Sequence, residues 1–252
     1  MIRVHRHALP AGLGQKLRVA TEKLHAEAAD TQLARTRWKA AKSIQQGVRT
    51  HLSDMVLGIK SCMYCGDHLS TDIDHFEPLA ETPLRAFDWL NHFLACSHCN
   101  SHEKRDRFPR DEAGVPLLVD PSGEDPHDHL MLALAAGRYE SLTSRGSATI
   151  DVFGLNRQDL VDARIAAFDC MCAVLRDRRR LLRAGDAAKA GRLAKSLFDQ
   201  PFIDVLYTML RVRHHSRAAL ILDGPEVVEA LADPALDLWS ATGSGRSGSC
   251  PR

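Results

Sequence analysis

The fold is decided by residues 62–104, which read CMYCGDHLSTDIDHFEPLAETPLRAFDWLNHFLACSHCNSHEK. Two Cys-x-x-Cys pairs frame this stretch, Cys62 with Cys65 and Cys96 with Cys99. Two pairs at this short spacing can supply four thiolates to one tetrahedral zinc ion. Four protein ligands close the coordination sphere, so the predicted zinc is structural and stabilises a segment that has too few apolar residues to hold itself together.

The residues enclosed by the cysteines are those that hydrolysis of a phosphodiester requires. Such hydrolysis needs an activated water, stabilisation of charge on the phosphate and help for the leaving oxygen. Neutral His75 can remove a proton from water near physiological pH. Asp74 is a hard oxygen ligand for a cation such as Mg²⁺, and Asn100 can give a carbonyl oxygen to the same cation. Asn91 is expected to hold the loop by hydrogen bonds and so orient His75. Adjacent strand residues point to opposite faces, so the backbone has to bend if Asp74 and His75 serve one site.

Each of these elements also has a plainer explanation. An isolated Asp-His dipeptide is usually incidental, and an Asn in a loop is normally a turn residue. Three rival functions remain open: a zinc-stabilised nucleic-acid-binding module without catalysis, an RNA-cleaving toxin with the same site residues, and a redox protein that uses its cysteine pairs as dithiols. His92 and His102 flank the site and could assist the leaving group or bind metal, and His98 lies inside a Cys pair and could replace a thiolate. Each of the three could instead serve only in packing or at the surface.

The composition is that of an ordinary globular protein. The chain has 252 residues, of which 44% are apolar and 26% charged, enough for one or two domains. A net charge of +1 does not indicate nucleic-acid binding, so local basic clusters have to carry that function. No apolar stretch reaches the roughly 18 residues that suggest a membrane span, and the first residues lack the apolar core of a secretion signal. We therefore expect a cytoplasmic, reducing location, where Cys-x-x-Cys pairs favour metal or redox chemistry over disulfides.

The periodicity predicts a mainly α protein with a small α+β insert. Residues 1–60 are expected to form an N-terminal helical region, 61–110 the nuclease core, 111–240 a mainly helical C-terminal region and 241–252 a flexible tail. Within the core, the order is a strand at residues 71–76, an extended piece at 87–94 and a short helix at 100–104 that begins after Ser97 as a cap. Further elements are expected as a strand at 145–153 and helices at 156–182, 187–197 and 201–214.

The register of these residues resembles the HNH endonuclease family with a ββα-metal finger, in its zinc-stapled subset. The motifs that carry the resemblance are Cys62-x-x-Cys65, Asp74-His75-Phe76-x-Pro78, Asn91 and Cys96-x-x-Cys99-Asn100-x-x-x-Lys104. The resemblance implies that His75 is the general base, that Asp74 and Asn100 bind a catalytic Mg²⁺ or Mn²⁺, and that Asn91 is structural. The common family pattern has Lys three residues after the Asn, where this chain has Glu103. Contacts with the nucleic acid are expected from Lys104, Arg105 and Arg107.

Softer motifs over roughly residues 45–175 resemble one HNH subgroup, the nuclease component of Septu-type and retron-associated anti-phage systems. They lie at residues 73–78, 87–89, 118–121, 124–130 and 154–164. The resemblance implies an effector nuclease that cleaves DNA and works beside an ATPase partner protein. Nothing in the composition shows this partner, and the choice between DNA and RNA, the cut site and the trigger are not visible in the sequence.

Overall fold

The computed structural model describes residues 1–56 and 61–236, and the predicted tail at residues 241–252 lies outside them. The N-terminal region is helical, as predicted, and is divided into α1 (Ala11–Ala26), α2 (Thr31–Ala40) and α3 (Lys42–Ser53). Asp30 caps the N-terminus of α2, because its side chain accepts a hydrogen bond from the Leu33 amide at 2.8 Å. Buried leucines on α1 and α3 pack these helices together.

The segment predicted to be the nuclease core follows as two antiparallel strands and a short helix. Strand β1 (Ser70–His75) pairs with β2 (His92–Cys96), with His75 opposite His92. Next comes His98–Lys104, which is a π-helix rather than an ordinary α-helix. The strand–strand–helix order agrees with the prediction, but the predicted cap does not, because Ser97 makes no side-chain capping bond.

Residues 126–152 depart from the prediction. A second hairpin, β3 (Leu130–Ala133) with β4 (Arg138–Ser141), is not expected from the sequence pattern. The strand predicted at residues 145–153 is wrong, since the segment forms helix α4 (Ser144–Val152). Thr143 caps this helix by accepting from the Gly146 amide at 3.1 Å. Positions 146, 149 and 152 are buried, a spacing of three that belongs to a helix and not to a strand.

The C-terminal region is built on one long helix, α5 (Gln158–Arg183), as predicted. Helices α6 (Ala187–Phe198) and α7 (Ile203–Val212) follow near their predicted positions, and α6 packs along α5. Two further helices, α8 (Ala218–Ile221) and α9 (Pro225–Leu231), complete the region. None of the described helices is both long and apolar enough to cross a bilayer.

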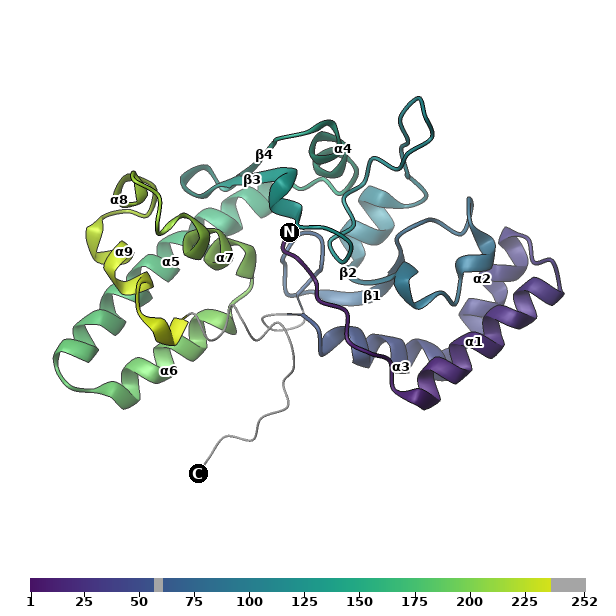
Figure 1. Cartoon of the computed structure of the whole chain (residues 1–252), viewed down its shortest axis with the longest axis horizontal. Coiled ribbons are helices and arrows are strands. Elements are labelled where there is room, and N and C mark those ends of the chain that lie inside the picture. The colour runs from purple at the N-terminus through teal and green to yellow at the C-terminus, as the bar shows by residue number, and fades with distance from the viewer. Residues whose placement is uncertain (57–60, 237–252) are drawn as a thin grey trace.

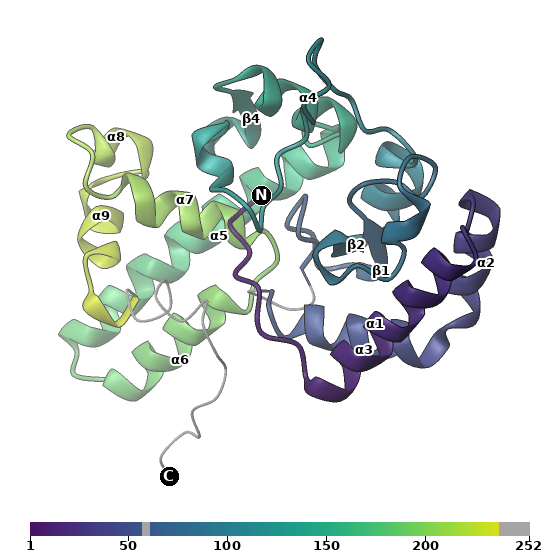
Figure 2. The same cartoon turned by 45° about the vertical axis from the view of Figure 1, so that its right-hand side comes forward.

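The helices lie in two groups on either side of the core. Figures 1 and 2 show α1, α2 and α3 at one end of the molecule and α5 to α9 at the other. Strands β1 and β2 lie between them, beside α3, which contacts both strands. The core therefore has helical cover from segments both before and after it in the sequence.

Candidate metal centre and active site

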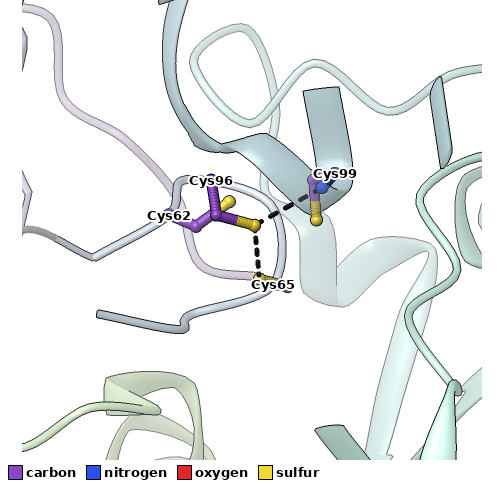
Figure 3. Close-up of side chains that lie close together, drawn as sticks. All are labelled: Cys62, Cys65, Cys96 and Cys99. Carbon is purple, nitrogen blue, oxygen red and sulfur yellow. Dashed lines mark hydrogen bonds between the residues drawn. The ribbon is translucent and has the colours of Figure 1, made fainter. Parts of the chain in front are cut away.

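The four cysteines of the two pairs converge on one point. Their sulfur atoms all lie within 4.8 Å of one another, and all four residues are buried (Figure 3). Cys62 and Cys65 come from the turn before β1, Cys96 ends β2, and Cys99 lies in the π-helix. The turn after the first pair is closed by the Gly66 amide, which donates to the Cys62 carbonyl at 3.0 Å.

This arrangement fits a tetrahedral zinc ion. Ligands about 2.3 Å from a zinc ion at tetrahedral angles have sulfurs about 3.8 Å apart. The sulfurs of Cys65 and Cys96 are 3.8 Å apart, and the Cys99 amide donates to the Cys96 sulfur at 3.4 Å (Figure 3). A disulfide needs about 2.05 Å, and the six cysteines that the structure describes are free thiols. Hydrogen bonds from Cys62 and other thiols lower the pKa of Cys65 to about 7 and also lower the pKa of Cys96, whereas burial raises the pKa of Cys62 and hydrogen bonds from the other cysteines raise that of Cys99. Zinc would be held by these four thiolates and would supply structural stability.

A cation from the C-terminal region faces the sulfur cluster. Arg157, directly before α5, places Nη1 3.7 Å from the Cys99 sulfur and Nη2 3.9 Å from the Cys65 sulfur. A zinc ion with four thiolates carries two negative charges, so the guanidinium offsets part of that charge. The sequence alone assigns no role to Arg157, because the residue lies far from the cysteines along the chain.

His75 is positioned by a backbone carbonyl. Its Nε2 lies 3.0 Å from the Ala86 carbonyl oxygen, which can only accept, so Nε2 carries the hydrogen. The lone pair is then on Nδ1, for which no partner exists among the described residues. Burial lowers the pKa of His75 below its usual 6.5, so the ring is neutral at pH 7. This is the protonation state that a general base requires.

The rings of His92 and Trp38 both make edge-type contacts with the ring of His75. The His92 Nε2 also donates to the Ala86 carbonyl at 3.0 Å, and its Nδ1 is buried without a partner. Burial holds the pKa of His92 well below 6.5. Trp38 of α2 lies with its ring centre 4.9 Å from that of His75 and 4.7 Å from that of His92. Helix α2 thus brings the N-terminal helical region beside the predicted base, a contact that sequence periodicity does not reveal.

The side chain of Asp74 contacts different residues from those that surround His75. Its Oδ2 accepts from the Tyr64 hydroxyl at 2.6 Å, and its Oδ1 accepts from the Lys104 ammonium at 3.0 Å. The side chain of Asp74 is 3% exposed and that of Lys104 is 0% exposed. The backbone does not bend enough to bring Asp74 and His75 to one point, so neighbouring strand residues keep their opposite directions.

Asn100 does not meet Asp74 either. Its Nδ2 donates instead to Oδ2 of Asp72 at 3.2 Å, and Asp72 is a half-buried residue of β1. Asp72 shares a strand face with Asp74, since the two residues are two positions apart. As placed, the residues predicted to hold a catalytic cation do not fit one, because Asp74 is engaged by Tyr64 and Lys104 and is apart from Asn100. The assignment of Asp74 and Asn100 as ligands of Mg²⁺ or Mn²⁺ stays a prediction.

Asn91 holds the loop that precedes β2. Its Oδ1 accepts from the Glu77 amide at 2.7 Å, and its Nδ2 donates to the carbonyls of Glu77 at 3.0 Å and Arg85 at 3.4 Å. The residue is 1% exposed, so these bonds satisfy a buried amide. They tie together the two ends of a loop that includes Ala86, the acceptor for His75. That Asn91 supports catalysis stays a prediction.

The residues predicted to bind nucleic acid differ in exposure. The burial of Lys104 contradicts its predicted contact with phosphate, because a phosphate cannot reach an ammonium enclosed by the protein. Arg105 and Arg107 are exposed, and Arg107 forms an ion pair with Asp151. Their contact with nucleic acid stays a prediction. His98 pairs with Glu103 at 3.0 Å and is not part of the sulfur cluster.

The comparison with known families agrees with this site. Residues 62–106 match the family model for HNH endonuclease. The match contains all four cysteines, His75 and the π-helix, and covers only the central part of the chain. No curated protein and no solved structure matches the chain. The chain therefore has an HNH endonuclease domain with a four-cysteine cluster.

Residues of the flanking motifs at 124–130 and 154–164 make hydrogen bonds that join elements around the HNH domain. Glu124 accepts from Arg145 at 2.6 Å and from His129 at 2.9 Å, which joins the loop before β3 to α4. Asn156 donates to the Tyr139 carbonyl at 2.8 Å and so attaches β4 to the segment before α5. These contacts explain the motif residues as parts of the scaffold around the HNH domain.

Proposed function

We propose that this protein is a metal-dependent HNH endonuclease that hydrolyses phosphodiester bonds of DNA. The observation that carries the proposal is His75, a neutral histidine with a fixed tautomer, inside the segment that matches the HNH endonuclease family. A pure binding module would have no use for a ring held in this way.

His75 would act as the base that activates the attacking water. The Ala86 carbonyl keeps the proton on Nε2, so Nδ1 is the atom that receives a proton from water. The Asn91 bonds hold the loop that contains Ala86 and so keep the acceptor in place. The four thiolates leave no open position on a zinc ion, so the zinc would serve the fold and not the reaction.

The catalytic metal is part of the proposal because HNH nucleases use divalent metals. Mg²⁺ or Mn²⁺ would stabilise charge on the phosphate. We assign no step to this ion, since the contacts of Asp74 do not fit it. Exposed Arg105 and Arg107, together with Lys39 and Lys42 near Trp38, would hold the phosphates on either side.

The test is cleavage of plasmid DNA, single-stranded DNA and RNA by the wild type and by His75→Ala, with Mg²⁺, with Mn²⁺ and with EDTA. Loss of one general base costs about 10²–10⁴-fold in rate, so cutting should fall by that factor while zinc content is unchanged. His25→Ala, an exposed histidine on α1, is the matched control and should cut like the wild type. Cleavage that survives in His75→Ala would refute the mechanism.

The substrate arms separate the rival functions. Cleavage of RNA alone would identify an RNA-cleaving toxin. Binding of DNA without cleavage by either protein, with zinc bound, would favour a binding module. Reversible dithiol chemistry without bound zinc would favour a redox protein.

We also propose an anti-phage role beside an ATPase partner, and this rests on the resemblance of the flanking motifs alone. The four thiolates require a reducing environment, which supports a cytoplasmic location. Co-purification of the tagged chain from its native host, followed by an ATPase assay of the complex, tests the partner. Recovery of the chain alone, with full nuclease activity, would contradict it.

A further inference from the structure

The cation beside Asp74 is a residue of the chain itself. The Lys104 ammonium donates to Asp74 Oδ1 at 3.0 Å and to the His75 carbonyl at 2.7 Å. Neither side chain is open to solvent, at 0% exposed for Lys104 and 3% for Asp74. A buried charge requires a partner of the opposite sign, and here each residue supplies the other's.

A divalent cation at Asp74 would conflict with this ammonium. Mg²⁺ binds carboxylate oxygens at about 2.0–2.1 Å. An ion on Oδ1 would then lie no more than about 5 Å from the Lys104 nitrogen, which is itself 3.0 Å from that oxygen. Two cations at that separation repel each other strongly in a buried site. The other oxygen is engaged by the Tyr64 hydroxyl at 2.6 Å.

The π-helix explains how Lys104 reaches this position. The Arg105 amide donates to the Asn100 carbonyl at 2.9 Å, a bond between residues five apart. A π-helical turn holds one more residue per hydrogen-bonded ring than an α-helical turn. Lys104 lies four residues after Asn100, one more than the family spacing. The wider turn accommodates the extra residue and brings the lysine back under β1.

We propose that Lys104 is the resident cation of Asp74 and a positioning residue for His75, so that Asp74 is not a metal ligand. The Lys104 ammonium neutralises the Asp74 carboxylate, and its second hydrogen bond fixes the backbone of His75. The role toward His75 rests on the proposed nuclease function, whereas the pairing with Asp74 does not.

The pairing is tested by a double-mutant cycle on the zinc-loaded protein, with Lys104→Met, Asp74→Asn and the double variant. Loss of one partner of a buried pair should lower Tm by about 6–20 °C. The double variant should lose about as much as one single variant, because no unpaired charge is left. The exposed pair of Arg37 and Glu27, treated in the same way with Arg37→Met and Glu27→Gln, is the control and should lose little. Losses that simply add at Lys104 and Asp74 would overturn the pairing.

Manganese tests whether Asp74 binds metal, without any activity assay. Mn²⁺ should leave Tm unchanged, or change it equally in the wild type and in Asp74→Asn. A rise in Tm that requires Asp74 would overturn the proposal. If the variants do not fold, the wild type suffices: a buried, ion-paired ammonium exchanges slowly and gives an NMR signal, which diamagnetic Mg²⁺ should leave in place. Loss of that signal on addition of Mg²⁺ would show that the ion displaces the ammonium from Asp74 and would overturn the proposal.

The role toward His75 is read from kinetics and ring tautomer. Lys104→Met should lower kcat with KM unchanged, because it displaces the base and touches no phosphate. A rise in KM alone would instead identify a substrate contact and overturn the positioning role. ¹⁵N-labelled histidine should show the Nε2–H tautomer of His75 in the wild type and a mixture of tautomers in Lys104→Met, and an unchanged spectrum would count against the role. A wild type without nuclease activity would refute the proposed function, and the cycle and the Mn²⁺ titration would still decide the pairing.

Discussion

Replacement of Arg157 by Met should weaken zinc binding, although Arg157 is not a zinc ligand. Its guanidinium lies 3.7 Å and 3.9 Å from two of the four sulfurs, and its side chain is 12% exposed. Two unit charges at this distance interact by about 4 kcal/mol at an effective dielectric constant of about 20. A zinc tetrathiolate carries two negative charges over four sulfurs, so each contact is worth roughly 2 kcal/mol before the cost of desolvating the guanidinium.

Removal of such supporting groups around metal sites typically costs about 10–100-fold in affinity. That range corresponds to about 1.4–2.7 kcal/mol. It is smaller than the summed electrostatic energy of the two contacts, because desolvation of the guanidinium offsets part of that energy. We therefore expect the zinc dissociation constant of Arg157→Met to rise by this factor. Arg157→Lys should lose less, because it keeps the charge but not the fork that reaches two sulfurs.

The assay is competition for zinc with a chromophoric chelator, supported by cobalt substitution to confirm the four-sulfur coordination. Arg192→Met, an exposed arginine on α6, is the matched control and should keep wild-type affinity. Wild-type affinity in Arg157→Met would refute the argument. That result would show that the four cysteines bind zinc equally well without a neighbouring positive charge.

Three other predictions concern stability. Cys96→Ser, or removal of zinc by a chelator, should unfold the core and lower Tm by more than about 10 °C, because structural zinc contributes folding energy directly; a chelated protein with wild-type Tm would contradict a structural ion. The unfolded state takes up a proton near pH 6.5 while buried His92 does not, so the stabilisation from His92 is complete above that pH and is lost as the pH falls. The free energy of unfolding should therefore fall between pH 7 and pH 5, and chemical denaturation should show a smaller fall in His92→Asn. Gly154→Ala should destabilise the fold by more than about 1 kcal/mol, since Gly154 has φ +55° and a Cβ would lie 2.6 Å from Glu103. On α6, a Cβ at Gly191 would meet nothing within 4 Å, so Gly191→Ala should stabilise the fold by about 0.5–1 kcal/mol. Equal effects of the two substitutions on the free energy of unfolding would contradict this.

The sequence predicts those parts of the site whose chemistry is local. Cysteines separated by two residues in each pair have few uses in a reducing compartment, so their spacing alone is enough to predict a four-sulfur zinc site. The order of strand, strand and helix follows from periodicity and turn residues. His75 can be proposed as a base because histidine is the side chain suited to that role near neutral pH.

Other parts could not be predicted because they depend on contacts between distant segments. Nothing in the sequence shows that Trp38 would lie on His75, or that Arg157 would face the sulfurs. The burial of Lys104 depends on a π-helix, and single-residue insertions of this kind have no clear sequence signature. The strand predicted at residues 145–153 failed because its short apolar residues suit a strand, whereas tertiary packing at positions 146, 149 and 152 selects the helical period.

The predicted nuclease core, residues 61–110, contains the candidate site residues, but residues outside these boundaries also pack against it. The Tyr64 ring stacks on Phe153 at 4.0 Å between centres, and the Phe202 amide donates to the Gly66 carbonyl at 2.9 Å. From the other side, the Arg6 guanidinium lies 4.3 Å from the centre of the Phe93 ring. The thiolates and the Lys104 pair place charge inside a small domain, and a short chain alone buries too little surface to enclose it. The flanking segments therefore supply the low-dielectric cover around the four cysteines, Asp74 and His75, on which the proposed chemistry depends.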